Sequence, residues 1–211
     1  MKYCLYLLLL LFIISCKPKT AHPNWKERSI KLTKNLGTVH IKLIPDFDTL
    51  HDWGNFTDYT CGAKQMYRYQ SKQYPIKEES GFIKHYPDSF FSLTISHVWR
   101  LKCDSNSKGT FDADSDLKQC IQDLIEINPQ FYRHLKFKIC KKITINGLDF
   151  AVISPFKYNW DTLPNNSLLA FTCYHKVMID FTFIKTGKSP YRGDFVSDAY
   201  DMLKTVRIER D

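Results

Sequence analysis

Alternation of apolar and polar side chains is the feature that most constrains the fold of this 211-residue chain. Successive side chains of a strand point to opposite faces of a sheet, so alternation indicates strands with one buried face. The longest run is too long for one typical strand and predicts a hairpin that turns near His175 and Lys176. Its members at every second position are Phe171, Cys173, His175, Val177, Ile179, Phe181 and Phe183.

Shorter segments repeat this pattern. A hairpin is predicted at Asn146-Gly147, because this dipeptide separates two alternating segments and suits the tight turn that joins antiparallel strands. The segment at 46–62 is rich in Asp and other polar residues, and we interpret it as a loop. Further strands are predicted at 39–43, 66–69, 82–85 and 91–99.

Two segments have helical rather than strand periodicity. The first, 116–125, has apolar residues at helical spacing and ends before Asn128-Pro129; the acidic residues of 112–116 suit its N-terminal cap better than a calcium loop. The second, 194–204, leads into a short strand near Ile208. Its predicted inward residues are Phe195, Ala199, Met202 and Leu203. This order of elements predicts an α+β fold, in which two main helices pack on an antiparallel sheet.

From the first helix through Asn146-Gly147 to the terminal segment Asp201-Met202-Leu203-Lys204-Thr205-Val206-Arg207-Ile208, the second half resembles PsbP-like domains. Such domains end in a helix and strand of this kind. The resemblance implies an α+β sandwich and favours a binding or assembly role in a membrane-associated setting. It transfers no catalytic residue.

The first sixteen residues contain Lys2, an apolar run over 5–14 and the closing sequence Ile13-Ile14-Ser15-Cys16. The run is too short to span a bilayer, and a basic start followed by a short apolar core defines an export signal. The closing tetrapeptide resembles the lipobox of bacterial lipoproteins. By that resemblance residues 1–15 are removed and Cys16 becomes the acylated first residue.

We therefore expect a signal peptide at 1–15, a lipidated tether at 16–28 with two prolines, and a single domain at 29–211. The expected location is the bacterial cell envelope, with membrane attachment through the lipid on Cys16. Lys17 is not the Asp that retains some lipoproteins in the inner membrane, which favours the outer membrane in a Gram-negative host.

The formal net charge is +8, yet export makes nucleic acid an improbable partner. Beyond Cys4 and Cys16, five cysteines remain, so one or two disulfides are expected in an oxidising envelope and at least one thiol stays unpaired. Their pairing is left open. These cysteines are Cys61, Cys103, Cys120, Cys140 and Cys173.

The candidate binding residues lie in the polar segment between Asp46 and Asp58. Loops often host binding sites, and a His near several carboxylates can ligate a metal or serve in acid–base chemistry, while an aromatic ring can stack on a ligand. The spacing matches no known metal motif, so we assign no metal and no cofactor. The selected residues are Asp48, His51, Asp52 and Trp53.

No His-Glu-x-x-His, Gly-x-Ser-x-Gly or glycine-rich phosphate motif occurs, so no catalytic residue is assigned and an enzyme is less expected than a binding protein. The favoured function is a non-enzymatic, lipid-anchored envelope protein that binds a protein partner or ligand near the membrane. Two alternatives remain: a small envelope hydrolase or metal-binding protein that uses the segment from Asp46 to Asp58, and an immunity-type inhibitor.

Overall fold

The structure is a computed structural model. It describes residues 24–33, 35–57, 62–76, 89–102, 113–115, 117–118, 122, 139–154, 166–186, 188–189 and 191–210. Cys16, the predicted export signal at 1–15, the predicted strand at 82–85 and Asp58 lie outside the described residues. In the described part of the chain, no helix is both long and apolar enough to cross a membrane.

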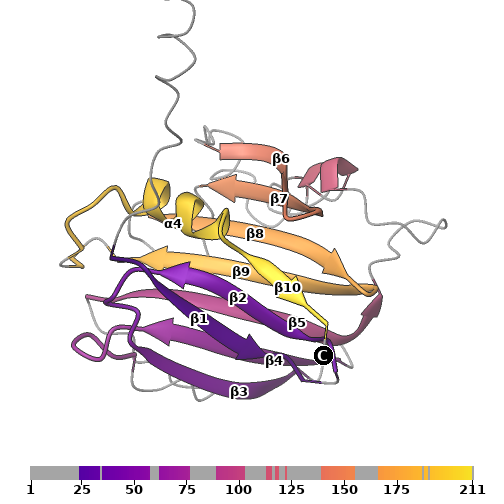
Figure 1. The fold of residues 1–211 in the computed structure, drawn as a ribbon, viewed down its shortest axis with the longest axis horizontal. Helices are drawn as coiled ribbons and strands as arrows, with labels where there is room; N and C mark the ends of the chain where they lie inside the picture. Colours follow the sequence, from indigo (N-terminus) through magenta and orange to yellow (C-terminus); the bar gives the residue numbers. More distant parts are fainter. Residues whose placement is uncertain are drawn as a thin grey trace, which may run out of the picture.

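Most of the described chain forms two antiparallel sheets (Figure 1). The large sheet has seven strands in the order β3-β4-β5-β9-β8-β7-β6, so its two halves meet where β5 pairs with β9. Its strands are β3 (Thr49–Thr57), β4 (Gly62–Gln70), β5 (Phe91–Lys102), β6 (Ile139–Ile145), β7 (Leu148–Ser154), β8 (Ser167–Tyr174) and β9 (Val177–Lys185).

The small sheet has three strands in the order β1-β2-β10, namely β1 (Lys26–Lys31), β2 (Thr38–Leu43) and β10 (Arg207–Glu209). Figure 1 shows it lying across the large sheet, with helix α4 (Phe195–Leu203) beside it near β8. The hydrophobic core fills the space between these layers, because Ile41 of β2, Phe181 of β9 and Met202 of α4 belong to one buried cluster. We call the side of the large sheet that faces this core its core face, and the opposite side its rear face.

The predicted α+β fold with two main helices is wrong. The chain is mostly β, with sheets of three and seven strands, and α4 is short. Within the described residues, the other helical positions are 113–115, which precede the helix predicted at 116–125, and 117–118 and 122, which lie within it. Helical periodicity marked these segments, but it could not show that the second layer is built from β1, β2 and β10.

Both predicted hairpins are confirmed. Asn146 and Gly147 join β6 to β7, and His175 and Lys176 join β8 to β9. All four residues have positive φ. Two consecutive residues with positive φ make the turn whose twist matches that of paired strands, which is why short turns between these strands close without a longer loop.

The predicted last helix is also confirmed. Asp194 caps it by accepting a hydrogen bond from the Ser197 backbone N–H, and the four residues predicted to face inward are buried. The predicted terminal strand is present as β10.

Two polar segments contain strands that the sequence did not indicate. The segment read as a loop contains β3, which pairs along its whole length with β4, and the expected tether already forms β1 from Lys26. Each is an edge strand of its sheet. An edge strand has a neighbour on one side and keeps much of its surface in water, so its side chains need not alternate.

Candidate functional site

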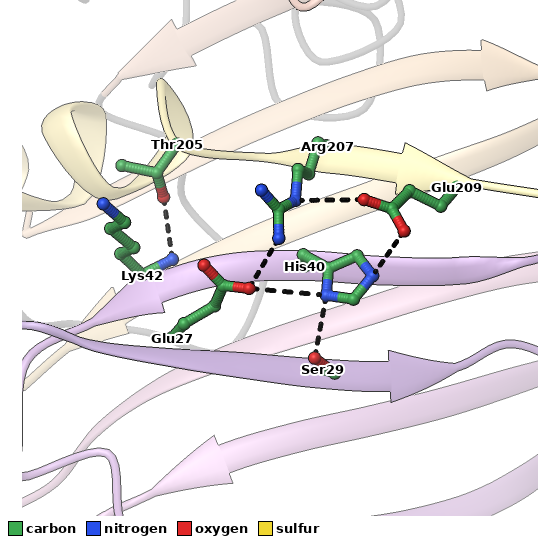
Figure 2. Close-up of polar contacts among 7 residues, drawn as sticks. All are labelled: Glu27, Ser29, His40, Lys42, Thr205, Arg207 and Glu209. Atoms are coloured by element: carbon green, nitrogen blue, oxygen red, sulfur yellow. Dashed lines mark hydrogen bonds and ion pairs between the residues drawn. The ribbon is translucent and has the colours of Figure 1, made fainter.

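The solvent face of the small sheet holds a connected set of polar side chains, shown in Figure 2. Strand register places them on one face, because Ser29 lies opposite His40 and His40 lies opposite Arg207. Apolar residues at the alternate positions, such as Ile30, Val39 and Ile41, are buried in the core. We define the His40 network as Glu27, Ser29, His40, Arg207 and Glu209.

His40 is the centre of this network because it lies on the middle strand. Its Nδ1 lies 2.8 Å from the Ser29 hydroxyl and 3.7 Å from a Glu27 carboxylate oxygen, and its Nε2 lies 3.4 Å from a Glu209 carboxylate oxygen. The side chain is 17% exposed. The imidazole is therefore held from both edges of the sheet, and only a small part of its surface remains accessible.

Arg207 connects the two edge strands. It donates a hydrogen bond to Glu27 of β1 over 2.6 Å, and its Nε lies 3.4 Å from Glu209 of its own strand. A further hydrogen bond ties the segment before β10 to β2: the Lys42 backbone N–H donates to the Thr205 hydroxyl over 2.8 Å (Figure 2). The network thus presents two carboxylates, a guanidinium and an imidazole at defined positions across three strands.

The order Ser29, His40, Glu209 places a hydroxyl, an imidazole and a carboxylate in a chain of contacts. A nucleophile activated in this way also needs donors for the developing oxyanion. The β2 backbone is paired on both sides by β1 and β10, and Glu27 shares Nδ1 with Ser29. The geometry therefore suits polar recognition better than acyl transfer. Among the described residues, no group of three or more His, Cys, Asp or Glu is arranged to hold a metal ion.

The four candidate residues chosen from the sequence do not converge on one site. Asp48 accepts hydrogen bonds from the Lys72 backbone N–H over 2.7 Å and from the Thr49 hydroxyl over 3.0 Å, and the first of these is the main reason that its pKa is lowered. It therefore fastens the turn after β4 to the start of β3. His51 and Trp53 project from the rear face, whereas Asp52 projects from the other side.

The structure instead brings Trp53 and His51 beside Arg68, which sequence reasoning missed. The Arg68 guanidinium lies over the Trp53 ring at 4.9 Å from its centroid, and His51 is the register partner of Arg68. Arg68 lies in a segment predicted as a strand. The sequence pattern around it did not indicate that its side chain is buried, with only 5% of the residue exposed. The His40 network was missed for a similar reason, because its members come from three segments that are far apart in the sequence.

The cysteines agree in part with expectation. Cys173 is disulfide-bonded, and its partner lies outside the described residues. Cys140 on β6 is a free thiol, and burial raises its pKa.

Comparisons with protein-family models, with curated proteins and with solved structures find no match to this chain. The resemblance to PsbP-like domains therefore gains no support from the family models and contributes nothing to the functional argument below.

Proposed function

We propose that this chain is an exported lipoprotein, anchored through Cys16, whose β domain binds a protein partner near the membrane through the His40 network. The leader and lipobox support export and acylation, and the domain supports binding rather than catalysis. The partner surface carries charges of both signs, because the His40 network offers carboxylates and a guanidinium side by side.

One observation carries the proposed binding role: contacts within the chain already hold the polar side chains of the network in place without a partner. Arg207 and His40 are each held by contacts from two strands. Ordering a long side chain costs conformational entropy on binding, and charges at fixed positions select partners with complementary charges. A surface whose charged side chains are already ordered favours a specific binding role over that of an ordinary solvent-exposed surface.

The tether keeps this surface near the bilayer. Residues 17–25 separate Cys16 from the first residue of β1, and that distance is at most about 35 Å when the chain is fully extended. Trp25 already packs against the core, so the free length is shorter still. A partner that reaches the network is therefore membrane-associated or close to the membrane.

The anchor is tested by mass spectrometry and detergent partitioning of wild-type and Cys16→Ala protein from a bacterial host. Wild-type protein should begin at Cys16, carry the mass of a diacylglyceryl group and a further acyl chain, and enter the detergent phase, because such an anchor is stable in membranes. Cys16→Ala should lose the lipid. A wild-type chain with an unmodified Cys16 would refute the anchor.

The binding role is tested by crosslinking in intact cells of the native host, followed by mass spectrometry. His40→Ala removes the centre of the network, and His51→Ala is the matched control on an edge strand of the other sheet. One protein should be crosslinked by wild-type and His51→Ala but lost with His40→Ala. Loss with His51→Ala alone would move the site to the segment between Asp46 and Asp58.

A further inference from the structure

The large sheet ends in two edge strands, β3 and β6, which lie at its opposite ends (Figure 1). An edge strand presents a row of backbone N–H and C=O groups that can pair with another chain, and proteins commonly protect such edges with lysine, proline or a bulge. β3 contains neither lysine nor proline. Its nine residues pair with β4 in one unbroken register, without a bulge. β3 is therefore an edge without the usual protection.

β3 presents an apolar and an acidic side chain on one face. Leu50 is 43% exposed, and no other large hydrophobic side chain is exposed in the described part of the chain. Asp52, two residues further, is also exposed. Both lie on the core face, because their register partners Tyr69 and Tyr67 belong to the buried cluster. β3 has no Lys or Arg to offset this negative charge.

β6 carries the opposite charge on the same face of the sheet. Ile139 and Ile143 of β6 pack against the core, and Lys141 lies between them at the alternate position. Lys141 is exposed, and its ammonium group lies over the Tyr200 ring at 4.8 Å from the centroid. β6 contains no Asp or Glu. Its core face thus offers apolar residues on either side of a cation.

The direction of the two strands allows them to meet in a second copy. Six antiparallel pairings separate β3 from β6, so both strands run the same way. A second copy in the same orientation continues the sheet, with its β3 parallel to β6 and both core faces on one side. The register that sets Asp52 beside Lys141 also sets Leu50 beside Ile139.

Pairing of either edge with itself is less favourable. Two β6 strands would bring Lys141 and Lys142 of both copies together, and like charges on adjacent strands are destabilising. Two β3 strands would leave Asp52 without a basic partner. We propose that β3 of one copy pairs with β6 of a second copy, so that the chain associates with itself head to tail. Such an interface does not close, and it gives a series of oligomers.

This proposal does not depend on the lipid anchor or on the His40 network. It is tested by sedimentation equilibrium of the full chain in detergent at low salt. A short strand pairing makes a small and weak interface, so the mass should rise above that of the monomer between about 10 µM and about 1 mM. A chain that stays monomeric throughout that range would overturn the proposal.

Charge reversal identifies the two edges. Asp52→Lys and Lys141→Asp each set like charges against each other, so each variant alone should associate at least about threefold more weakly than wild type. An equimolar mixture of the two should associate as wild type does, because each edge then meets the opposite charge. Lys176→Asp, in the turn between β8 and β9, is the matched control and should leave association unchanged. A mixture no stronger than its components would overturn the proposal.

Disulfide trapping tests the register without relying on these variants. The register places His51 beside Cys140, a free thiol, on the rear face. Under mild oxidation His51→Cys should form dimers that are lost when Cys140→Ser is added. Leu50→Cys is the control, because Leu50 is exposed but lies on the opposite face. Equal crosslinking of the two variants, or His51→Cys dimers that survive Cys140→Ser, would overturn the proposal.

Discussion

The assignment of the His40 network to recognition predicts that its ion pairs add little to folding stability. Glu27 and Arg207 are the sharpest test, because their contact joins β1 to β10 across β2. The perturbation is a double-mutant cycle that combines Glu27→Gln and Arg207→Gln, in which the coupling energy isolates the pair from the other contacts of each residue.

The structure sets the expected magnitude. The two side chains are 43% and 46% exposed, and exposed ion pairs contribute about 0.2–1 kcal/mol. The short distance of 2.6 Å places this pair in the upper half of that range, so we expect a coupling of about 0.5–1 kcal/mol. In 1 M NaCl the Debye length falls to about 3 Å, and the coupling should fall by more than half.

The assay is urea unfolding of the four proteins at low and high salt, monitored by circular dichroism. A coupling above about 2 kcal/mol, or one that does not respond to salt, would refute the reasoning, because exposed pairs do not reach that value. It would show that the pair holds the small sheet together, and binding losses in network variants could then reflect misfolding.

Three further predictions concern stability. Gly37 has φ +101° and a Cβ there would lie 2.1 Å from the Glu209 carbonyl oxygen, whereas a Cβ on Gly147, φ +81°, meets nothing; in thermal unfolding Gly37→Ala should therefore cost about 2–4 kcal/mol, and Gly147→Ala about 1 kcal/mol from backbone strain alone. Equal costs would contradict the close approach. Phe181→Ala should cost about 3–5 kcal/mol in urea unfolding, because the ring is fully buried and packs against Phe150; a cost below about 1 kcal/mol would place it outside the core. Burial raises the pKa of Asp180 above its ordinary 3.8, so the folded state holds the proton more tightly than the unfolded chain. Relative to Asp180→Asn, wild-type stability should rise as pH falls through the folded pKa and level off below 3.8; a difference that stays constant with pH would refute this.

The turns and the last helix could be predicted from the sequence because their causes are local. Asn146-Gly147 supplies two residues that tolerate positive φ, and the spacing of Phe195, Ala199 and Met202 is the spacing of one helix face. Alternation likewise found the central strands β5, β8 and β9, because one face of each packs against the core. The resemblance of residues 13–16 to a lipobox is equally local, and acylation of Cys16 stays a prediction.

The second layer, the His40 network and the burial of Arg68 were decided by tertiary structure. Strands β1 and β3 are edge strands, and their side chains face water too often to show a period. Glu27, His40 and Arg207 meet because β10 returns to pair with β2. The Arg68 side chain is buried because Trp53, Gln70 and Ile76 contact its guanidinium. Local sequence carries propensity and periodicity, whereas contacts between distant segments depend on strand order and register, which no short stretch of residues contains.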